Sequence, residues 1–215
     1  MTSLESPFPG LWATPPTQLP YQANVFVRSF VLERAAGNIA VYNSPGLTAA
    51  SADIAALGGV SRLLVNHGHE EMYGAPDLDA DVWVHERDRR ELSRSLSVTG
   101  VFTARSTIDD DLEVIPTPGH TPGTTSFLWD NGDHRFLFTG DFIWVEEGEW
   151  KAVVLGSAGR ADYLDSLRLV RDLDFDVLVP WGTTDGDPYA VPASRDEIRD
   201  RVEVIIDRVA AGGSR

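Results

Sequence analysis

Three histidines and one aspartate lie in short motifs with the composition of a metal site. His67 and His69 belong to the segment VNHGHEE, His120 to TPGHTPG and Asp141 to LFTGD. Imidazole nitrogens and a carboxylate oxygen together suit zinc or ferrous iron. The chain contains no cysteine, which excludes thiolate ligands, iron–sulfur clusters and disulfides. Any bound metal must be held by nitrogen and oxygen, so we expect zinc, iron or manganese.

Each of these motifs follows an apolar run that is typical of a buried strand. The runs are residues 63–65, 114–115 and 136–138. The candidate ligands should therefore gather at strand ends. Residues two apart in an extended segment project to the same side, so we expect His67 and His69 to chelate one ion. The prolines and glycines on both sides of His120 indicate a rigid loop that orients its ring.

Each candidate also has a purely structural interpretation. The two histidines of VNHGHEE could cap a turn, His120 could stabilise a proline turn and Asp141 could cap a loop. Taken together, three of the five histidines at apolar strand ends favour the metal interpretation. His85 and His134 do not join them. We expect His85 to pack near the helix that follows it and His134 to occupy a hairpin.

The rest of the sequence predicts alternating strands and helices. Residues 25–27, 30–32 and 39–42 have the pattern of a β-meander. A helix over residues 48–57 and a buried strand over residues 60–65 should follow. This order is typical of a strand, helix, strand unit.

The second half of the chain repeats this alternation and ends in a well-marked helix. Apolar residues at helical spacing predict a helix over residues 161–173, followed by a strand over residues 176–179. In the last helix Ser194 is the expected N-cap, with Glu197 completing a capping box. These elements together indicate a layered α/β fold.

The first 21 residues differ from the remainder in composition. They contain five prolines, so we expect residues 1–21 to form an extended arm rather than a regular element. No linker or internal repeat divides the remainder, which predicts a single domain over residues 22–215. The arm could also support self-association into a homo-oligomer.

The charge balance narrows the classes of partner. The chain has 33 acidic and 18 basic residues, a formal net charge of −15. Nucleic acids and anionic membranes require a positive surface, so a small-molecule substrate fits better. No stretch approaches the roughly 20 apolar residues needed to cross a bilayer. The N-terminus lacks the pattern of a secretory signal, and we therefore expect a cytoplasmic protein.

The histidine and aspartate motifs resemble those of the metallo-β-lactamase superfamily. Its members carry HxHxDH, a lone histidine often within TPGHTPG, an aspartate within FTGD and a last histidine in PGHG. The resemblance spans roughly residues 22–210. It implies a four-layer αβ/βα sandwich with the metal at the crest between two sheets.

The chain departs from this family pattern at the second metal. Glu71 and Met72 stand where the family has aspartate and histidine, and residues 180–183 read PWGT in place of PGHG. Because two second-metal histidines are missing, the simplest inference is one divalent ion, zinc in preference to iron. Its ligands would be the residues of the opening motifs, His67, His69, His120 and Asp141.

Several other residues near these motifs allow two interpretations. Glu71 could act as a general base or bind a second ion, or it could be a solvated glutamate at a helix start. Trp144 and Trp150 could wall a substrate pocket or pack on a sheet. Trp181 could fill the space of the missing histidine. Asp185 could replace that histidine, although its turn needs no functional explanation.

The resemblance implies a metal-dependent hydrolase that acts on a small ester, thioester, lactone or amide. Asp141, as ligand or water orienter, and Glu71, as base, are the candidate catalytic residues. An alternative is a mononuclear-iron dioxygenase of the persulfide dioxygenase type, whose two histidines and one aspartate map onto His67, His120 and Asp141. A third interpretation is a degenerate relative that binds a ligand without turnover.

Overall fold

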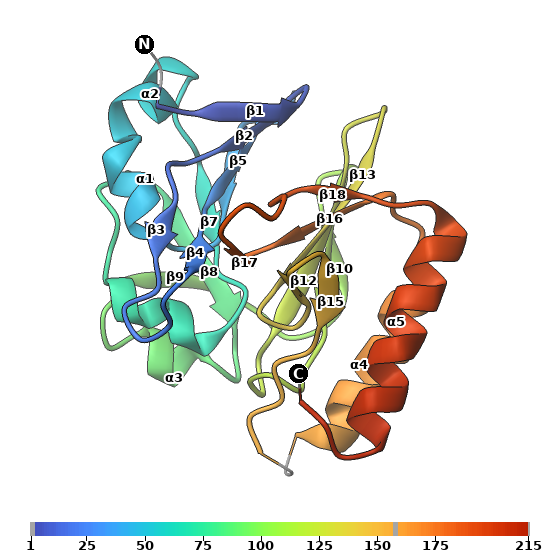
Figure 1. Cartoon of the computed structure of the whole chain (residues 1–215). Coiled ribbons are helices and arrows are strands. Elements are labelled where there is room, and N and C mark those ends of the chain that lie inside the picture. Colours follow the sequence, from blue (N-terminus) through green and yellow to red (C-terminus); the bar gives the residue numbers. More distant parts are fainter. Residues whose placement is uncertain (1–2, 157–158, 215) are drawn as a thin grey trace.

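The structure, a computed structural model, describes residues 3–156 and 159–214 and shows two sheets that pack face to face between layers of helices (Figure 1). Within these residues the first sheet has seven strands in the order β1-β2-β5-β6-β7-β8-β9. They are β1 (Glu5–Phe8), β2 (Leu11–Ala13), β5 (Phe30–Leu32), β6 (Ile39–Val41), β7 (Arg62–Leu64), β8 (Asp81–His85) and β9 (Val98–Phe102).

The second sheet comes from the C-terminal half of the chain. Its six strands in the described residues run in the order β10-β11-β12-β13-β16-β18. They are β10 (Ser106–Ile108), β11 (Leu112–Pro116), β12 (Thr125–Asp130), β13 (Arg135–Gly140), β16 (Val177–Pro180) and β18 (Val191–Pro192).

A third, smaller sheet combines strands from both halves of the chain. Its order is β15-β14-β17-β4-β3. The strands are β3 (Thr17–Gln18), β4 (Val25–Val27), β14 (Trp144–Glu146), β15 (Glu149–Lys151) and β17 (Gly182–Thr184). Because β4 pairs with β17, this sheet links the N-terminal and C-terminal halves directly.

Helices cover the outer face of each large sheet (Figure 1). The first sheet carries α1 (Pro45–Ala49), α2 (Ser51–Ala56) and α3 (Arg89–Leu92), and the second carries α4 (Arg160–Asp172) and α5 (Arg195–Ala210). A short 3-10 helix, η1 (Gly68–Tyr73), follows β7.

Three hydrophobic clusters show that the layers are α, β, β and α. Alternate residues of a strand face opposite sides, so Phe127 and Leu128 of β12 enter different clusters. Phe127 packs with Val41 of the first sheet in the central cluster between the sheets. Leu128 packs with Leu167 of α4 in the cluster under the outer helices. The four-layer αβ/βα sandwich that the family resemblance implies is thus confirmed.

The N-terminal segment differs from the expected irregular arm. Residues 5–18 contain three short strands, and β2 pairs with β5 along Leu11–Ala13. The prolines do not prevent this, because the strands are short and Pro15 and Pro16 fall between β2 and β3. The absence of regular structure predicted for this segment was therefore wrong. The domain division at residue 22 stays a prediction.

Two further local expectations need correction. The segment predicted as a β-meander is split, because β4 joins the small sheet while β5 and β6 form the expected hairpin in the first sheet. The helix predicted over residues 48–57 is two short helices that begin at Pro45. Proline is favoured in the first turn of a helix, where its missing N–H is not needed.

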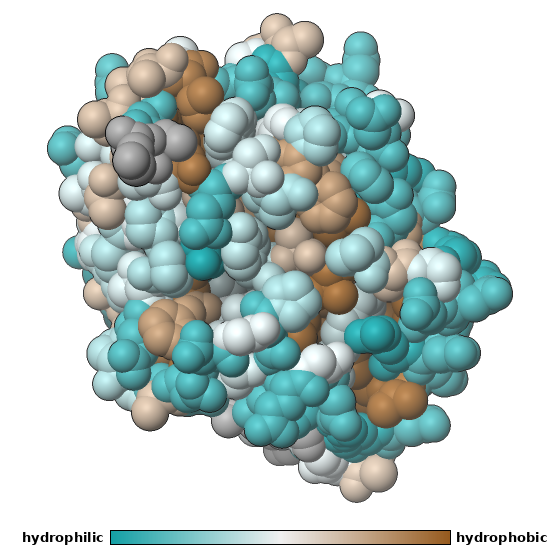
Figure 2. All heavy atoms as spheres, turned by 45° about the horizontal axis from the view of Figure 1, so that its top comes forward, coloured by the Kyte–Doolittle hydropathy of each residue, from teal (hydrophilic) through white to brown (hydrophobic). Residues whose placement is uncertain are grey.

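The best-marked elements of the second half agree with the prediction. Helices α4 and α5 lie within a residue or two of the predicted bounds, and Ser194 and Glu197 form the expected capping box. None of the helices in the described ranges is long and apolar enough to cross a membrane. The face that Figure 2 shows is mostly hydrophilic, with hydrophobic residues in separate small patches.

Candidate metal centre

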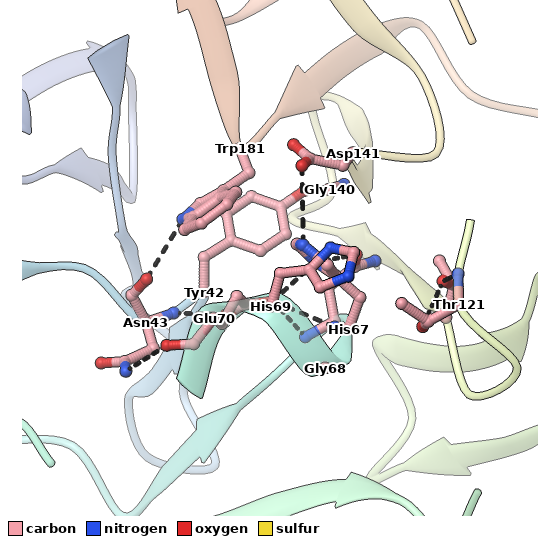
Figure 3. Close-up of polar contacts among 12 residues, drawn as sticks. Tyr42, Asn43, His67, Gly68, His69, Glu70, Thr121, Gly140, Asp141 and Trp181 are labelled. Atoms are coloured by element: carbon pink, nitrogen blue, oxygen red, sulfur yellow. Dashed lines mark hydrogen bonds and ion pairs between the residues drawn. The ribbon is translucent and has the colours of Figure 1, made fainter. Parts of the chain in front are cut away.

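The four predicted ligands converge at one edge of the sandwich. His67 and His69 follow β7, His120 lies in the loop between β11 and β12, and Asp141 follows β13. Each residue offers one ligand atom, and these atoms all lie within 4.8 Å of one another. Figure 3 shows the Asp141 carboxylate opposite the rings of His67 and His69. Residues far apart in sequence thus form one cluster of imidazoles and a carboxylate.

The local backbone brings His67 and His69 together differently from the expectation. His67 is extended, with φ −154° and ψ 166°, but the next residues form η1 rather than a continued strand. His67 is the N-cap of this helix, and His69 lies in its first turn. The two histidines therefore lie in one cluster, but the extended geometry predicted for the segment was wrong, and chelation of one ion stays a prediction.

The ring of His67 is oriented from behind by two acceptors. Its Nδ1 lies 3.0 Å from Asn66 Oδ1 and 3.2 Å from Glu70 Oε1. Nδ1 is then the protonated nitrogen, and Nε2 presents its lone pair to the cluster. Nε2 is buried without a hydrogen-bond partner among the described residues, and Asp141 Oδ2 lies 3.6 Å from it. A buried imidazole nitrogen without a hydrogen-bond partner is suited to be a metal ligand.

His120 is oriented in the same way. Its Nδ1 lies 2.8 Å from the carbonyl oxygen of Val153 and donates to it, so Nε2 faces the cluster. There it lies 3.0 Å from Nδ1 of His69. Two imidazole nitrogens at this distance either share one N–H in a hydrogen bond or, with both lone pairs free, can bind one cation. The donor set therefore fits a divalent cation.

Burial and neighbouring charges shift the pKa of each ring in a different way. Burial lowers the pKa of His120 well below its usual value, and His67 adds to this effect. The pKa of His69 is also lowered, by burial and by His67. Burial would lower the pKa of His67 too, but the hydrogen bond to Glu70 and the charge of Asp141 outweigh it and raise that pKa. Neutral rings at two of the three positions are the form that binds metals.

Glu70, which the sequence did not single out, holds the first histidine in place. Its side chain is fully buried. Oε1 accepts hydrogen bonds from the backbone N–H groups of Asn66 (2.8 Å) and His67 (3.1 Å), and Oε2 accepts from that of Asn43 (2.5 Å). The carboxylate therefore fixes both the backbone and the ring of His67. Its position at N3 of η1, after an extended residue, matches a capping box and was the available signal.

Asp88 is a second residue that sequence reasoning missed. It is buried, and Oδ2 accepts from the backbone N–H of Gly68 at 2.9 Å and from the hydroxyl of Thr121 at 2.5 Å. Oδ1 accepts from the backbone N–H of Gly123 at 2.8 Å. One carboxylate thus ties the loop of His67 and His69 to the loop of His120. No local pattern around Asp88 indicates this role.

The approach to Asp141 depends on close backbone packing. Gly140 has φ +59°, and a Cβ there would lie 1.8 Å from Asn66 Oδ1. The N–H of Gly140 donates to the Tyr42 hydroxyl at 2.8 Å, and that hydroxyl donates to the carbonyl of Val179 at 2.6 Å. Glycine before Asp141 therefore allows β13 to end directly against the segment that carries His67.

The positions where the family pattern has second-metal ligands lie on a cavity beside the cluster. Glu71, Met72 and Gly182 all line it. Within the described ranges, the cluster of four is the one group of histidine, aspartate and glutamate that could hold a metal ion. Asp185 lies in an exposed turn and is not part of it.

Three of the tryptophans near the site have different surroundings. Trp181 is buried with its ring 5.1 Å from that of His67, and its indole N–H donates to the carbonyl of Asn43. Trp144 lines the cavity, as one of the two interpretations predicted. Trp150 instead packs in the cluster under the outer helices. Trp144 and Trp150, which belong to the same hairpin, therefore lie in different environments.

The other histidines lie outside the cluster, as expected. His85 ends β8 and accepts a hydrogen bond from the backbone N–H of Arg87, just before α3. His134 lies in the turn between β12 and β13 and contacts Asp176 at 3.1 Å.

Comparison with known proteins gives the same family as the motifs. The model of the metallo-beta-lactamase superfamily matches residues 50–182. A metallo-beta-lactamase family protein from Thermus thermophilus has a TM-score of 0.67 at 20% identity, with 95% of this chain and 80% of that chain covered. The metallo-beta-lactamase GOB-18 from Elizabethkingia meningoseptica has a TM-score of 0.61 at 17% identity, with 91% of each chain covered.

A third solved structure is BJP-1, a subclass B3 metallo-beta-lactamase of Bradyrhizobium japonicum. Its TM-score is 0.59 at 20% identity, and 92% of each chain is covered. At these identities the structural likeness shows the fold alone. The search of curated proteins gave no match.

Proposed function

This chain belongs to the metallo-beta-lactamase superfamily, and we propose that it is a metal-dependent hydrolase with a single divalent cation. The substrate class in this proposal is a small ester, thioester, lactone or amide. The observation that supports it most is the set of four ligand atoms within 4.8 Å, with the buried Nε2 of His67 among them. Three imidazoles and a carboxylate favour zinc over iron as the cation.

The proposal gives each polar residue of the centre a separate role. His67, His69 and His120 hold the cation, and Asp141 is a fourth ligand or orients the attacking water. When bound, the cation would lower the pKa of a coordinated water toward about 7 and would polarise the substrate carbonyl. Glu71, whose side chain lines the cavity, is proposed to accept the proton from the water.

The hydrolase proposal predicts loss of activity when one ligand is removed. In the zinc-loaded protein, His120→Ala should lower kcat/KM for a p-nitrophenyl ester by roughly 1,000-fold or more, because the cation is lost with its ligand. His134→Gln is the matched control, since it changes a histidine in the β12–β13 turn, away from the cluster. Equal activity in His120→Ala and the unchanged protein contradicts the proposal.

One observation favours a second candidate, the mononuclear-iron dioxygenase. Asp141 Oδ2 lies 3.6 Å from Nε2 of His67 and 3.7 Å from Nε2 of His120, so these three residues form a compact triad. Two histidines and one carboxylate are the ligand set of non-haem iron oxygenases. Oxygen uptake by the iron-loaded protein with glutathione persulfide, together with no ester hydrolysis by the zinc form, would favour this function. Neither activity in either metal form would favour a non-catalytic binding protein.

The partners, the oligomeric state and the location of the protein remain predictions from the sequence. A small-molecule substrate, the absence of nucleic-acid and membrane partners, a possible homo-oligomer and a cytoplasmic location are predictions. The net charge of −15 supports the exclusion of polyanionic partners.

A further inference from the structure

A cavity of about 400 Å³ opens directly beside the candidate metal centre. His69, His120 and Asp141 form part of its wall, so a molecule in the cavity would contact the cluster. The small third sheet contributes Val25, Trp144 and Gly182 to the wall as well. Residues from both halves of the chain therefore enclose one space next to the ligand atoms.

The mouth of this cavity is unusually apolar for an exposed surface. Four large hydrophobic residues are exposed in the part of the chain that the structure describes. Three of them, Tyr21, Met72 and Leu155, line this cavity. Leu19 and Val153 extend the apolar wall inward. Exposed apolar side chains that gather at one opening indicate a ligand with an apolar group.

The charges of the cavity are all of one sign. Glu71, Glu91 and Asp141 line it, and its lining among the described residues includes neither lysine nor arginine. Among the described residues, Arg94 contacts Glu91 at 4.0 Å on the exposed side. Three carboxylates outweigh the two positive charges of a bound divalent cation. A negatively charged substrate would therefore enter a space where none of the described lining residues is a lysine or arginine that could pair with it.

We infer that this cavity selects ester-type substrates that carry an apolar chain and no negative charge. The inference rests on the proposed hydrolase function and names its substrate class. Neutral substrates fit the apolar wall directly. A positively charged group at the far end is also accepted, because Glu71 and Glu91 provide opposite charge and Tyr21 and Trp144 provide aromatic faces.

The test compares three p-nitrophenyl esters with the same six-carbon acyl chain. The far end of the chain is a methyl group, a carboxylate or a trimethylammonium group. For the zinc-loaded protein we expect kcat/KM of the methyl ester to exceed that of the carboxylate ester by about 10-fold or more at low salt. We expect kcat/KM of the trimethylammonium ester to exceed that of the carboxylate ester by at least the same factor. High salt should narrow both gaps, because it screens the charges.

One charge variant and its control test whether Glu91 contributes to the preference for esters without negative charge. Glu91→Gln should lower the ratio of kcat/KM for the methyl ester to kcat/KM for the carboxylate ester by about threefold, because one of the three carboxylates is removed. Glu86→Gln is the matched control, since Glu86 is exposed three residues before α3 and does not line the cavity. Equal hydrolysis of the carboxylate and methyl esters, or a preference for the carboxylate ester, overturns the inference.

A binding measurement separates this inference from the hydrolase proposal. After zinc removal the proposed hydrolysis cannot occur, so calorimetry can measure the affinity of the protein for amides with the same three chain ends. Without the cation, a carboxylate gains nothing by coordination. Tighter binding of the neutral amide by about 10-fold supports the inference even if no ester is hydrolysed. Equal affinities, preference for the carboxylate or no binding of any amide contradicts it.

Discussion

Two polar clusters, each built around a buried side chain, join the same pair of sheets at opposite ends, and they differ in whether protein groups alone satisfy that side chain. At one end, after β5 and before β11, the side chain of Arg34 is 1% exposed, and all three of its guanidinium nitrogens have acceptors. Asp109 and Asp111 provide the opposing charge, and Trp129 donates to Asp111 as well. This cluster is complete without any ligand.

At the other end, after β7, β11 and β13, the polar cluster is incomplete. Glu70 and Asp88 are satisfied by backbone N–H groups, but they only orient the loops and rings in front of them. The buried Nε2 of His67 has no hydrogen-bond partner in the described part of the chain. Protein groups therefore satisfy the hydrogen bonds of the buried side chain in the Arg34 cluster but not in the histidine cluster, where one buried nitrogen lacks a partner among the described residues.

The largest expected effect tests whether the Arg34 cluster is purely structural. Arg34→Met should lower the free energy of unfolding by about 2–3 kcal/mol, because the carboxylates of Asp109 and Asp111 lose their cationic partner. This loss is smaller than that expected for a fully buried ion pair, because Asp111 is partly exposed to water. Urea unfolding measures this loss. Arg105→Met removes an exposed pair with Glu113 and should change stability by less than about 1 kcal/mol. Metal binding should stay unchanged in both variants, and a loss of metal in Arg34→Met would break the comparison.

The next effect tests whether the buried carboxylate at the metal end acts through its ligand. Glu70→Gln keeps the shape of the side chain but places an N–H₂ group against backbone donors, so we expect metal affinity to fall by about 10- to 100-fold. Competition with a chelator of known affinity measures this change. Glu71→Gln, one residue on and facing the cavity, should change the affinity by less than about threefold. Similar losses in the two variants would show that burial of Glu70 is not what matters.

The smallest expected effect is the pH dependence of the structural cluster. Burial would raise the pKa of Asp111, but the hydrogen bonds and charge of Arg34 outweigh it and hold that pKa below its usual 3.8. A lowered folded-state pKa adds stability that is fully present above the unfolded value and is lost as pH falls through the folded value. The unfolding midpoint of the unchanged protein should therefore drop more than that of Asp111→Asn below about pH 4. Parallel midpoints over this range would contradict the assignment.

The sequence predicted a layered α/β fold and the four candidate ligands because both depend on local patterns, whereas the four-layer arrangement came from the resemblance to the family. Apolar runs mark the buried strands, and the motifs of His67, His69, His120 and Asp141 stand directly after them. The capping box of α5 was visible for the same reason.

The residues that sequence reasoning missed depend on contacts between distant segments. Asp88 lies 20 residues from Gly68 and 33 from Thr121, and its neighbours in sequence are ordinary exposed charges. Glu70 looks the same as Glu71 until burial separates them. The strand pairing of β4 with β17 joins residues near 26 and 183, and the alternation of a three-residue strand cannot select between two sheets.

Metal content per chain tests the central claim most directly, because the claim is that distant imidazoles and a carboxylate converge on a single cation. We predict about one zinc ion per chain by elemental analysis after expression in metal-supplemented medium, and loss of that ion in His67→Ala and His120→Ala but not in His134→Gln. A chain that retains no divalent metal, or retains as much in His67→Ala as in the unchanged protein, would contradict the account.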